Sequence, residues 1–173
     1  MTSIQDLGRQ GFEAYGIPNA GVLDSCAAIR ANLLVGNSKN KAVLEITLIG
    51  PTLLFSTTCQ IAISGAECEC FINDNRIRTE KVYTMYKQDV LKIKKVNQGC
   101  RAYLAFGGEM NIPSQLNSKS TYAYANIGGL NGDYLKVGDK IPINVKIRPE
   151  RNHFEYQLND ICLLYTSPSP RDA

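Results

Sequence analysis

The sequence has no tryptophan, a single histidine (His153) and no apolar run approaching the roughly 18 residues that cross a membrane. It also lacks a basic segment followed by an apolar one near Met1, so no secretory signal is predicted. Its six cysteines include no C-x-x-C pair, and with one histidine to assist them a structural zinc site is not expected. Unpaired thiols in a chain without a signal indicate the cytoplasm. We therefore expect a cytoplasmic protein with no metal site and no membrane partner.

Charge of one sign is not in large excess either. The 173 residues carry 19 Lys and Arg against 16 Asp and Glu, which gives a formal net charge of +3. So small and scattered a charge does not predict nucleic-acid binding. The length fits one ordinary domain, and 44% apolar with 20% charged residues is typical of a globular chain.

The last residues differ in character from the rest of the chain. Cys162 to Asp172 spell the string that a commonly used transposase sequencing adaptor gives when it is translated in one frame. We therefore hypothesise that residues 1–161 are native and that residues 162–173 are translated adaptor, to be excluded from fold reasoning. A natural Ser/Pro tail is the alternative, and the underlying nucleotide sequence distinguishes the two. On the first hypothesis the chain is the N-terminal part of a longer domain.

One helix is predicted near the start of the chain. Asp24 suits an N-cap, residues 25–35 are rich in Ala and Leu, and Gly36 follows as a stop. Between Gly8 and Gly21, repeated glycines and a proline predict a loop without regular structure.

Short apolar segments of strand length fill the middle of the chain. They span residues 43–49, 52–55, 60–63, 69–72, 81–85, 90–96 and 101–106. Turn-forming residues separate them, among them Gly65, the cluster 73–75 and Gly99. Strands at this spacing favour a barrel or sandwich over alternating βαβ units, so the predicted class is mainly β with one clear helix. Residues 107–138 are rich in Gly, Asn, Ser and Tyr and predict loops.

General catalytic motifs are missing. The sequence contains no P-loop, no dinucleotide-binding G-x-G-x-x-G, no nucleophile elbow and no H-E-x-x-H. His153 lies among charged and polar neighbours and is expected at the surface. The alternation of Glu and Cys over residues 67–70 predicts a strand with carboxylates on one face and thiols on the other.

Two polar clusters stand out against this background. Gln5, Asp6 and Arg9 lie beside glycines that let backbone approach a ligand, and Arg suits bidentate capture of a carboxylate or phosphate. Residues 117–121 collect hydroxyls, an amide and the ammonium of Lys119, which suit an anion such as phosphate. The first pattern would also arise from an Asp6–Arg9 pair that only fixes the loop. The second would also arise from an ordinary polar turn.

Linked motifs along the chain resemble those of a known family. They are Thr2-Ser3-Ile4-Gln5-Asp6-Leu7-Gly8-Arg9, Gly16-x-Pro18-x-x-Gly21-x-x-Asp24, Ala31-Asn32-x-Leu34-Val35-Gly36-Asn37, Leu44-Glu45-x-Thr47-x-x-Gly50-Pro51, Ser64-Gly65-Ala66 and Gly99-x-Arg101-x-Tyr103-Leu104-Ala105-x-x-Gly108. In this order and spacing they resemble the biotin-dependent carboxyltransferase family. That family includes the C subunit of 5-oxoprolinase and the carboxyltransferase portion of urea carboxylase. The resemblance covers residues 2–142, and each motif alone is weak.

The resemblance has departures at charged positions. The family's Leu-Gly-Ser-Arg-Ser-Thr is found here with Lys119 in place of Arg, which keeps the charge but loses the planar fork. Its later Gly-Arg-x-Leu-x-x-Gly-Asp is found with Asp133 in place of Arg. Members also begin with a short strand before the Thr-Ser-Ile-Gln motif, for which Met1 leaves no room. We therefore expect both ends of the chain to be clipped.

The resemblance implies a cyclophilin-like β-barrel, incomplete in this chain, and a place in a multi-subunit enzyme. In bacterial 5-oxoprolinase the C subunit works with partner subunits A and B to open 5-oxoproline to glutamate, using ATP with Mg²⁺. Phosphorylation of the amide oxygen would create a leaving group and calls for anion-binding side chains. The chain is thus expected to be one subunit of an ATP-dependent amide hydrolase, and to be inactive alone.

The resemblance also assigns roles to individual residues. Those expected to bind substrate or phosphate are Gln5, Arg9, Arg101, Ser118, Lys119, Ser120 and Thr121. Those expected to cap and pin the helix are Asp24, Asn32 and Asn37, while Glu45 suits either role. No residue is assigned to catalysis.

Two other functions fit the same resemblance. One is a carboxyltransferase that moves a carboxyl group from carboxybiotin to urea or a similar amide. The other is a regulatory binding protein that antagonises a kinase inhibitor. Neighbouring genes would discriminate among the three, because each function requires different partners: subunits A and B, a biotin carboxylase, or a histidine kinase with its inhibitor.

Overall fold

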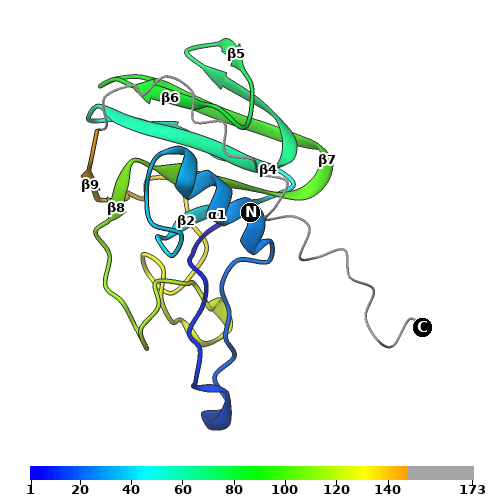
Figure 1. Ribbon diagram of the computed structural model, residues 1–173, viewed down its shortest axis with the longest axis vertical. Helices are drawn as coiled ribbons and strands as arrows, with labels where there is room; N and C mark the ends of the chain where they lie inside the picture. Colours follow the sequence, from blue (N-terminus) through cyan, green and yellow to red (C-terminus); the bar gives the residue numbers. More distant parts are fainter. Residues whose placement is uncertain (148–173) are drawn as a thin grey trace.

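The computed structural model describes residues 1–147 (Figure 1). The predicted boundary at residue 161, the adaptor hypothesis for residues 162–173 and the expected surface position of His153 lie outside the described residues. The described part is mainly β-sheet with one α-helix packed on it, which confirms the predicted class (Figure 1). No helix in this part is long and apolar enough to cross a membrane.

The helices and strands follow one another in a mainly β order. They are β1 (Thr2–Gln5), η1 (Glu13–Tyr15), α1 (Ser25–Leu34), β2 (Val43–Thr47), β3 (Thr52–Leu54), β4 (Cys59–Ile72), β5 (Asn75–Ile77), β6 (Val82–Met85), β7 (Val90–Phe106), β8 (Gly108–Met110), η2 (Ala123–Ala125) and β9 (Ile143–Val145). The loop predicted before the helix contains one 3₁₀ turn, η1. The opening motif forms a strand, β1, that the apolar pattern alone did not predict.

One antiparallel sheet of seven strands makes up most of the structure. Its order is β1-β2-β7-β4-β5, with β3 paired to β7 and β6 paired to β4. Within residues 1–147 the two ends of this order, β1 and β5, do not pair with each other, so the sheet is not closed. The sheet expected to belong to a β-barrel is therefore open over these residues. β8 and β9 form a separate two-stranded ladder.

The two longest strands correct the prediction. The apolar pattern predicts separate strands at 60–63 and 69–72, and again at 90–96 and 101–106, but each pair forms one continuous strand. Gly65 and Gly99, with φ of +100° and +89°, produce bulges inside β4 and β7 and do not end them. A bulge re-aims a strand and preserves the ladder on either side of it. The prediction is therefore right about which residues disturb the strands and wrong about their effect.

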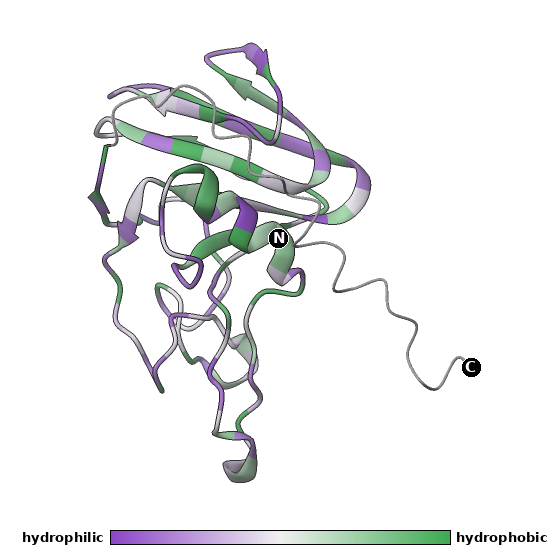
Figure 2. Cartoon of the chain, in the orientation of Figure 1, coloured by the Kyte–Doolittle hydropathy of each residue, from purple (hydrophilic) through white to green (hydrophobic). Residues whose placement is uncertain are grey.

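The turn between β4 and β5 is a tight hairpin. Asn73 and Asp74 have φ of +48° and +68°, and Ile72 pairs with Asn75 across them. Positive φ at both central residues is typical of a type I′ turn, which Asn and Asp tolerate well. The predicted turn is confirmed, and Figure 2 shows that the tip of this hairpin is hydrophilic.

The predicted helix forms as α1 and packs closely on the sheet. The Asp24 side chain accepts a hydrogen bond of 3.0 Å from the Ala27 amide, so the predicted N-cap is confirmed. The buried face of the helix is made of small side chains, Ala27, Ala28 and Ala31, which meet Val43, Ala62, Tyr103 and Ala105 on the sheet. Small residues on both sides allow the helix axis to approach the strands.

The register places polar residues on the helix side of the sheet. Ser3 lies opposite Glu45, Glu45 opposite Tyr103, and Tyr103 opposite Ser64. Since facing residues of an antiparallel ladder project to the same side, these four side chains form one row. Residues of the opposite parity, such as Ile4, Leu44 and Leu104, are fully buried in the main core on the other face.

Residues 67–70 alternate as predicted. Cys68 and Cys70 are buried in the main core, and their Sγ atoms lie 3.3 Å apart. Glu67 is exposed and Glu69 is half-buried. The thiols therefore belong to the inner face of β4.

Loop segments cover the outer edge of β1. The Thr121 amide donates to Ile4 O at 2.9 Å, and the Leu135 amide donates to Thr2 O at 2.9 Å. Figure 1 shows the segments that follow β1 and β8 extending together beyond the sheet. This arrangement brings the two polar clusters of the sequence into contact.

Candidate functional site

The first candidate region is a group of hydrogen-bonded side chains around Asp6. We call it the Asp6 cluster, and it consists of Gln5, Asp6, Arg9, Ser118, Lys119, Ser120 and Thr121. The Asp6 carboxylate accepts hydrogen bonds of 2.6 Å from Ser118 Oγ, Ser120 Oγ and the Lys119 amide, and one of 2.8 Å from the Gly8 amide. The structure thus unites the two clusters that the sequence places more than a hundred residues apart.

Arg9 is the most deeply buried charge of the Asp6 cluster. Its side chain is fully enclosed, and its Nη2 donates to Ser120 O. Within residues 1–147, Nε and Nη1 have no hydrogen-bond partner. Burial lowers the pKa of the guanidinium, whereas the nearby charge of Asp6 raises it. Gln5 Oε1 also lacks a partner among the described residues, although Gln5 Nε2 donates to Ser3 Oγ and Thr121 O.

Lys119 is already engaged by protein groups. Its Nζ donates to Glu109 Oε1 at 2.8 Å and to Met110 O at 2.7 Å. Lys41 Nζ approaches the other oxygen, Glu109 Oε2, to 2.5 Å. Hydrogen bonds from the two lysines lower the pKa of Glu109 to about 2. An anion contact by Lys119 stays a prediction, and any such contact would compete with this carboxylate.

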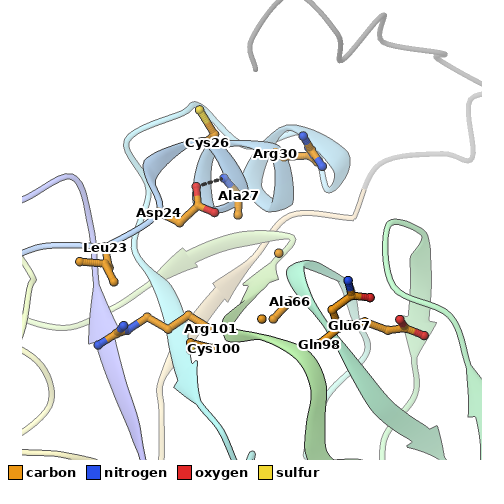
Figure 3. Close-up of a pocket in the computed structure, with 12 residues that line it drawn as sticks. Leu23, Asp24, Cys26, Ala27, Arg30, Ala66, Glu67, Gln98, Cys100 and Arg101 are labelled. Carbon is orange, nitrogen blue, oxygen red and sulfur yellow. Dashed lines mark hydrogen bonds between the residues drawn. The ribbon is translucent and has the colours of Figure 1, made fainter. Parts of the chain in front are cut away.

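The second candidate region is a pocket of about 590 Å³ between α1 and the bulges of β4 and β7. It is lined by Leu23, Asp24, Cys26, Ala27, Arg30, Gly65, Ala66, Glu67, Gln98, Gly99, Cys100 and Arg101 (Figure 3). Of the residues predicted to bind substrate, only Arg101 lines it. None of the six predicted binding residues of the Asp6 cluster lines this pocket with Arg101.

Two bulge glycines make room for the pocket. A Cβ at Gly65 would lie 2.9 Å from Arg101 O and 3.3 Å from the Ala27 Cβ, so this glycine permits α1 to approach the sheet. A Cβ at Gly99 would lie 2.9 Å from the Ala66 Cβ. Their positive φ values are also ones that side-chain-bearing residues rarely adopt. The bulges thus shape the pocket floor from main chain and small side chains.

A buried carboxylate holds Arg101 at the edge of this pocket. Glu45 is 8% exposed, and its Oε1 accepts a hydrogen bond of 3.2 Å from Arg101 Nε. Its Oε2 accepts from the Leu23 amide and from Tyr103 Oη, both at 2.9 Å. Tyr103 Oη accepts in turn from the Asp24 amide at 2.8 Å, and burial raises the pKa of this phenol. Figure 3 shows the Arg101 side chain extending from β7 toward Leu23.

A second charged pair borders the pocket on its far side. Arg30 Nη1 lies 3.6 Å from Glu80 Oε1, which also accepts from Ser64 Oγ at 2.8 Å and from the Gly65 amide at 3.3 Å. Arg30 projects from α1 in Figure 3. The pocket therefore has a guanidinium on each of two walls.

Asn32 and Asn37 lie at the far end of α1. Asn32 Nδ2 donates to Lys41 O at 2.7 Å, and Asn37 Nδ2 donates to Asn32 Oδ1 at 3.1 Å and to Phe106 O at 2.8 Å. Asn37 Oδ1 accepts from the Gly108 amide at 3.0 Å. These contacts tie the end of the helix to β7 and β8.

Sequence reasoning missed three residues of these regions. Tyr103 and Arg30 border the pocket network, and Glu109 holds Lys119. The alternation of Arg101 and Tyr103 in a predicted strand could have indicated that both side chains project to one face. Arg30 and Glu109 carried no comparable signal. In the described part of the chain, no group of three or more His, Cys, Asp or Glu is placed to hold a metal ion.

Comparison with known proteins finds relatives of two kinds. The chain is 42% identical over 144 residues to the urea amidolyase of Lachancea kluyveri, covering 83% of this chain and 8% of that protein. It is 41% identical over 156 residues to the C subunit of 5-oxoprolinase from Escherichia coli, covering 90% of this chain and 49% of that one. The crystal structure of the K. lactis urea amidolyase matches with a TM-score of 0.81 and 44% identity, over 83% of this chain and 9% of that one. The chain thus spans about half of one relative and less than a tenth of the others.

A match to a protein family agrees with the motifs. Residues 15–170 match the family described as carboxyltransferase domain, subdomain A and B. The match covers most of the chain, and the relatives named above are enzymes or enzyme subunits of the kinds that the motif resemblance indicated. That resemblance is confirmed, and the chain belongs to the family of carboxyltransferase domains with subdomains A and B.

Proposed function

We propose that this chain is part of a subunit that opens the cyclic amide 5-oxoproline to glutamate at the expense of ATP, together with partner subunits A and B. Its similarity to the C subunit of a 5-oxoprolinase supports this function, because about half of that protein is matched at 41% identity. The pocket beside α1 is the proposed binding site for the amide.

The position of Arg101 carries the proposal. Its Nε donates to Glu45, and no residue within 1–147 accepts a hydrogen bond from its two Nη groups. A guanidinium fork of this kind is suited to a carboxylate, and 5-oxoproline has a carboxylate attached to its ring. Ala27 and Ala66 supply apolar surface in the same pocket for the ring methylenes.

The Asp6 cluster has a different proposed part. Ser118, Ser120 and Thr121 do not line the pocket and are each less than a tenth exposed, so their proposed part is to enclose Arg9 and Gln5 and not to touch the amide. Arg9 keeps two buried donors, Nε and Nη1, without a partner among the described residues, which supports its contact with an anion or another enclosed acceptor; the unpartnered Gln5 Oε1 calls instead for a donor.

ATP chemistry is assigned to the partner subunits. The described residues include no P-loop motif and no group of three or more His, Cys, Asp or Glu placed to hold a metal ion, which supports this assignment. The proposed task of this chain is therefore to bind and orient the amide while a partner supplies the phosphoryl group.

Similarity to urea amidolyase favours a second candidate function. In this alternative the chain transfers a carboxyl group, carried by biotin on another domain, to urea or a related amide. Urea has no charge and no methylene groups, so it would use neither the Arg101 fork nor the apolar surface of the pocket.

Calorimetric titration distinguishes the two functions. We expect the chain to bind L-5-oxoproline and not urea, and Arg101→Gln to weaken 5-oxoproline binding about tenfold or more because a charged hydrogen bond is lost. Arg76→Gln removes an exposed arginine outside the pocket and serves as the matched control. Binding of urea alone would reject the first function and favour the second.

A reconstituted enzyme tests the reaction itself. A 5-oxoprolinase in which this chain replaces the matching half of the C subunit should release glutamate from 5-oxoproline when ATP and subunits A and B are present. Arg101→Gln in the same chimera should reduce that release. A chimera that assembles with A and B but releases no glutamate would contradict the proposal.

A further inference from the structure

We propose that Glu45 and Tyr103 are positioning residues that orient the Arg101 guanidinium toward a carboxylate in the pocket. The identity of that carboxylate rests on the proposed function, but the geometry of the network does not. Neither residue lines the pocket, so both would act on a ligand only through Arg101.

The network joins three separate parts of the chain at one carboxylate. Glu45 comes from β2, Arg101 and Tyr103 come from β7, and the Leu23 amide comes from the loop that enters α1. Glu45 and Tyr103 face each other in the ladder, so their 2.9 Å hydrogen bond joins two paired strands, β2 and β7. The carboxylate is therefore fixed before any ligand binds.

Because Glu45 contacts the Nε side of the Arg101 guanidinium, the N–H donors on the other side stay available to a ligand. Arg has five N–H donors, and the contact at Nε uses one of them. The four Nη donors are then left for a planar acceptor, with the plane of the guanidinium set by Glu45. Without this contact the Arg101 side chain would populate several rotamers, and ligand binding would carry the entropy cost of restricting it to one.

Tyr103 extends the same restraint to the helix. Its hydroxyl donates to Glu45 Oε2 and accepts from the Asp24 amide, and Asp24 caps α1. The tyrosine is fully buried, so its ring cannot move without disturbing the packing of α1. The first turn of α1 and the Arg101 side chain are thus connected through the same hydrogen-bonded network.

Nitrogen-15 NMR of the arginine side chains gives a readout that needs no ligand. The Arg101 Nε–Hε resonance, identified by its loss in Arg101→Lys, should be protected from solvent exchange in the wild-type chain. Glu45→Gln keeps the size of the side chain but removes its charge, and we expect it to accelerate this exchange. Arg76 provides the reference resonance of an exposed arginine. If the solvent-exchange rate of Arg101 Nε–Hε is the same in Glu45→Gln as in wild type, the proposal is overturned.

A double-mutant cycle on ligand binding tests whether Glu45 acts through Arg101. Calorimetry would measure L-5-oxoproline and acetate binding in wild type, Glu45→Gln, Arg101→Lys and the double variant. We expect Glu45→Gln alone to weaken 5-oxoproline binding about tenfold and to add little in the Arg101→Lys background. Tyr103→Phe should cause a smaller loss of the same kind. Melting temperature and circular dichroism would confirm that each variant is folded.

The outcomes separate this proposal from the proposed function. Equal losses from Glu45→Gln in both backgrounds would overturn the positioning role and leave the function standing. Acetate binding that depends on Glu45 and Arg101, without binding of 5-oxoproline, would support the positioning role and overturn the function. Binding of neither ligand would overturn both.

Discussion

The ammonium group of Lys119 lies 2.8 Å from the Glu109 carboxylate, which a second lysine, Lys41, approaches from the other side. Lys119 occupies the position at which the resembled family has arginine, and its charge is paired with a carboxylate of the same chain. The two lysines hold the pKa of Glu109 near 2, well below its ordinary value of 4.5. This ion-paired group links the turn before β2, strand β8 and the Asp6 cluster.

Acid should weaken this link in a defined range. Because the folded pKa of Glu109 is depressed, its stabilisation is present above about pH 4.5 and is lost as the pH falls toward about 2. Glu109→Gln should therefore melt at a lower temperature than wild type at pH 7, and the difference should shrink between pH 4.5 and pH 2. Glu69→Gln makes the same chemical change on β4, outside this ion-paired group, and serves as the matched control. A constant difference across the range would contradict this assignment.

The bulge in β7 predicts that adding one methyl group at Gly99 lowers the free energy of unfolding more than adding one at an open glycine. Gly99→Ala requires positive φ and places a Cβ 2.9 Å from the Ala66 Cβ, so we expect a loss of about 2–4 kcal/mol of unfolding free energy. Gly11→Ala has nearly the same φ, +90°, with nothing within 4 Å, and should cost about 1 kcal/mol. Urea denaturation measures both. Equal losses would show that the close approach to Ala66 is not a constraint.

The cap of α1 should make a modest contribution to stability. Asp24→Ala removes the acceptor of the Ala27 amide and should lower the unfolding free energy by about 1 kcal/mol, whereas Asp24→Asn keeps an acceptor and should cost less. Chemical denaturation followed by circular dichroism would measure the two losses. A larger effect from Asn than from Ala would contradict the capping role.

The Asp6 carboxylate should be far more costly to remove. Asp6→Ala leaves the Ser118 and Ser120 hydroxyls and the Lys119 and Gly8 amides without their acceptor, and we expect a loss of about 2–4 kcal/mol. Ser118→Ala removes one donor only and should cost about 1 kcal/mol. If the two variants have similar stability, Asp6 does not organise this cluster.

Local signals predicted much of the fold. The cap at Asp24, the alanine-rich run and the Asn73-Asp74 turn each have one dominant local explanation, and each was confirmed. Gly65 and Gly99 have no single local explanation, because a glycine with positive φ can end a strand or bend it. Only the pairing of β4 with β7 across them decides between the two outcomes, and that pairing is a long-range property.

The site was predicted as a set of residue types but not as an arrangement. Arg9 and Lys119 were identified by chemistry, yet nothing local shows that Asp6 lies between their two segments. The prediction groups Arg101 with them, although Arg101 pairs with Thr47 in the ladder and donates a hydrogen bond to Glu45, near the start of α1. Contacts between distant segments require the strand register, which the apolar pattern alone does not supply.

The hydrogen bonds between Asp6 and Ser120 have a consequence for how the chain is made. The two residues are 114 positions apart, so closing this contact carries a large loop-closure entropy that earlier sheet formation must reduce. On the ribosome, Asp6 emerges early, and the donors of Ser118, Lys119 and Ser120 become available to it only after nearly the whole described chain has been made. We infer that the motif that opens the chain is among its last parts to reach native structure, and that in a nascent chain shorter than about 120 residues the Asp6 carboxylate lacks its donors from residues 118–120.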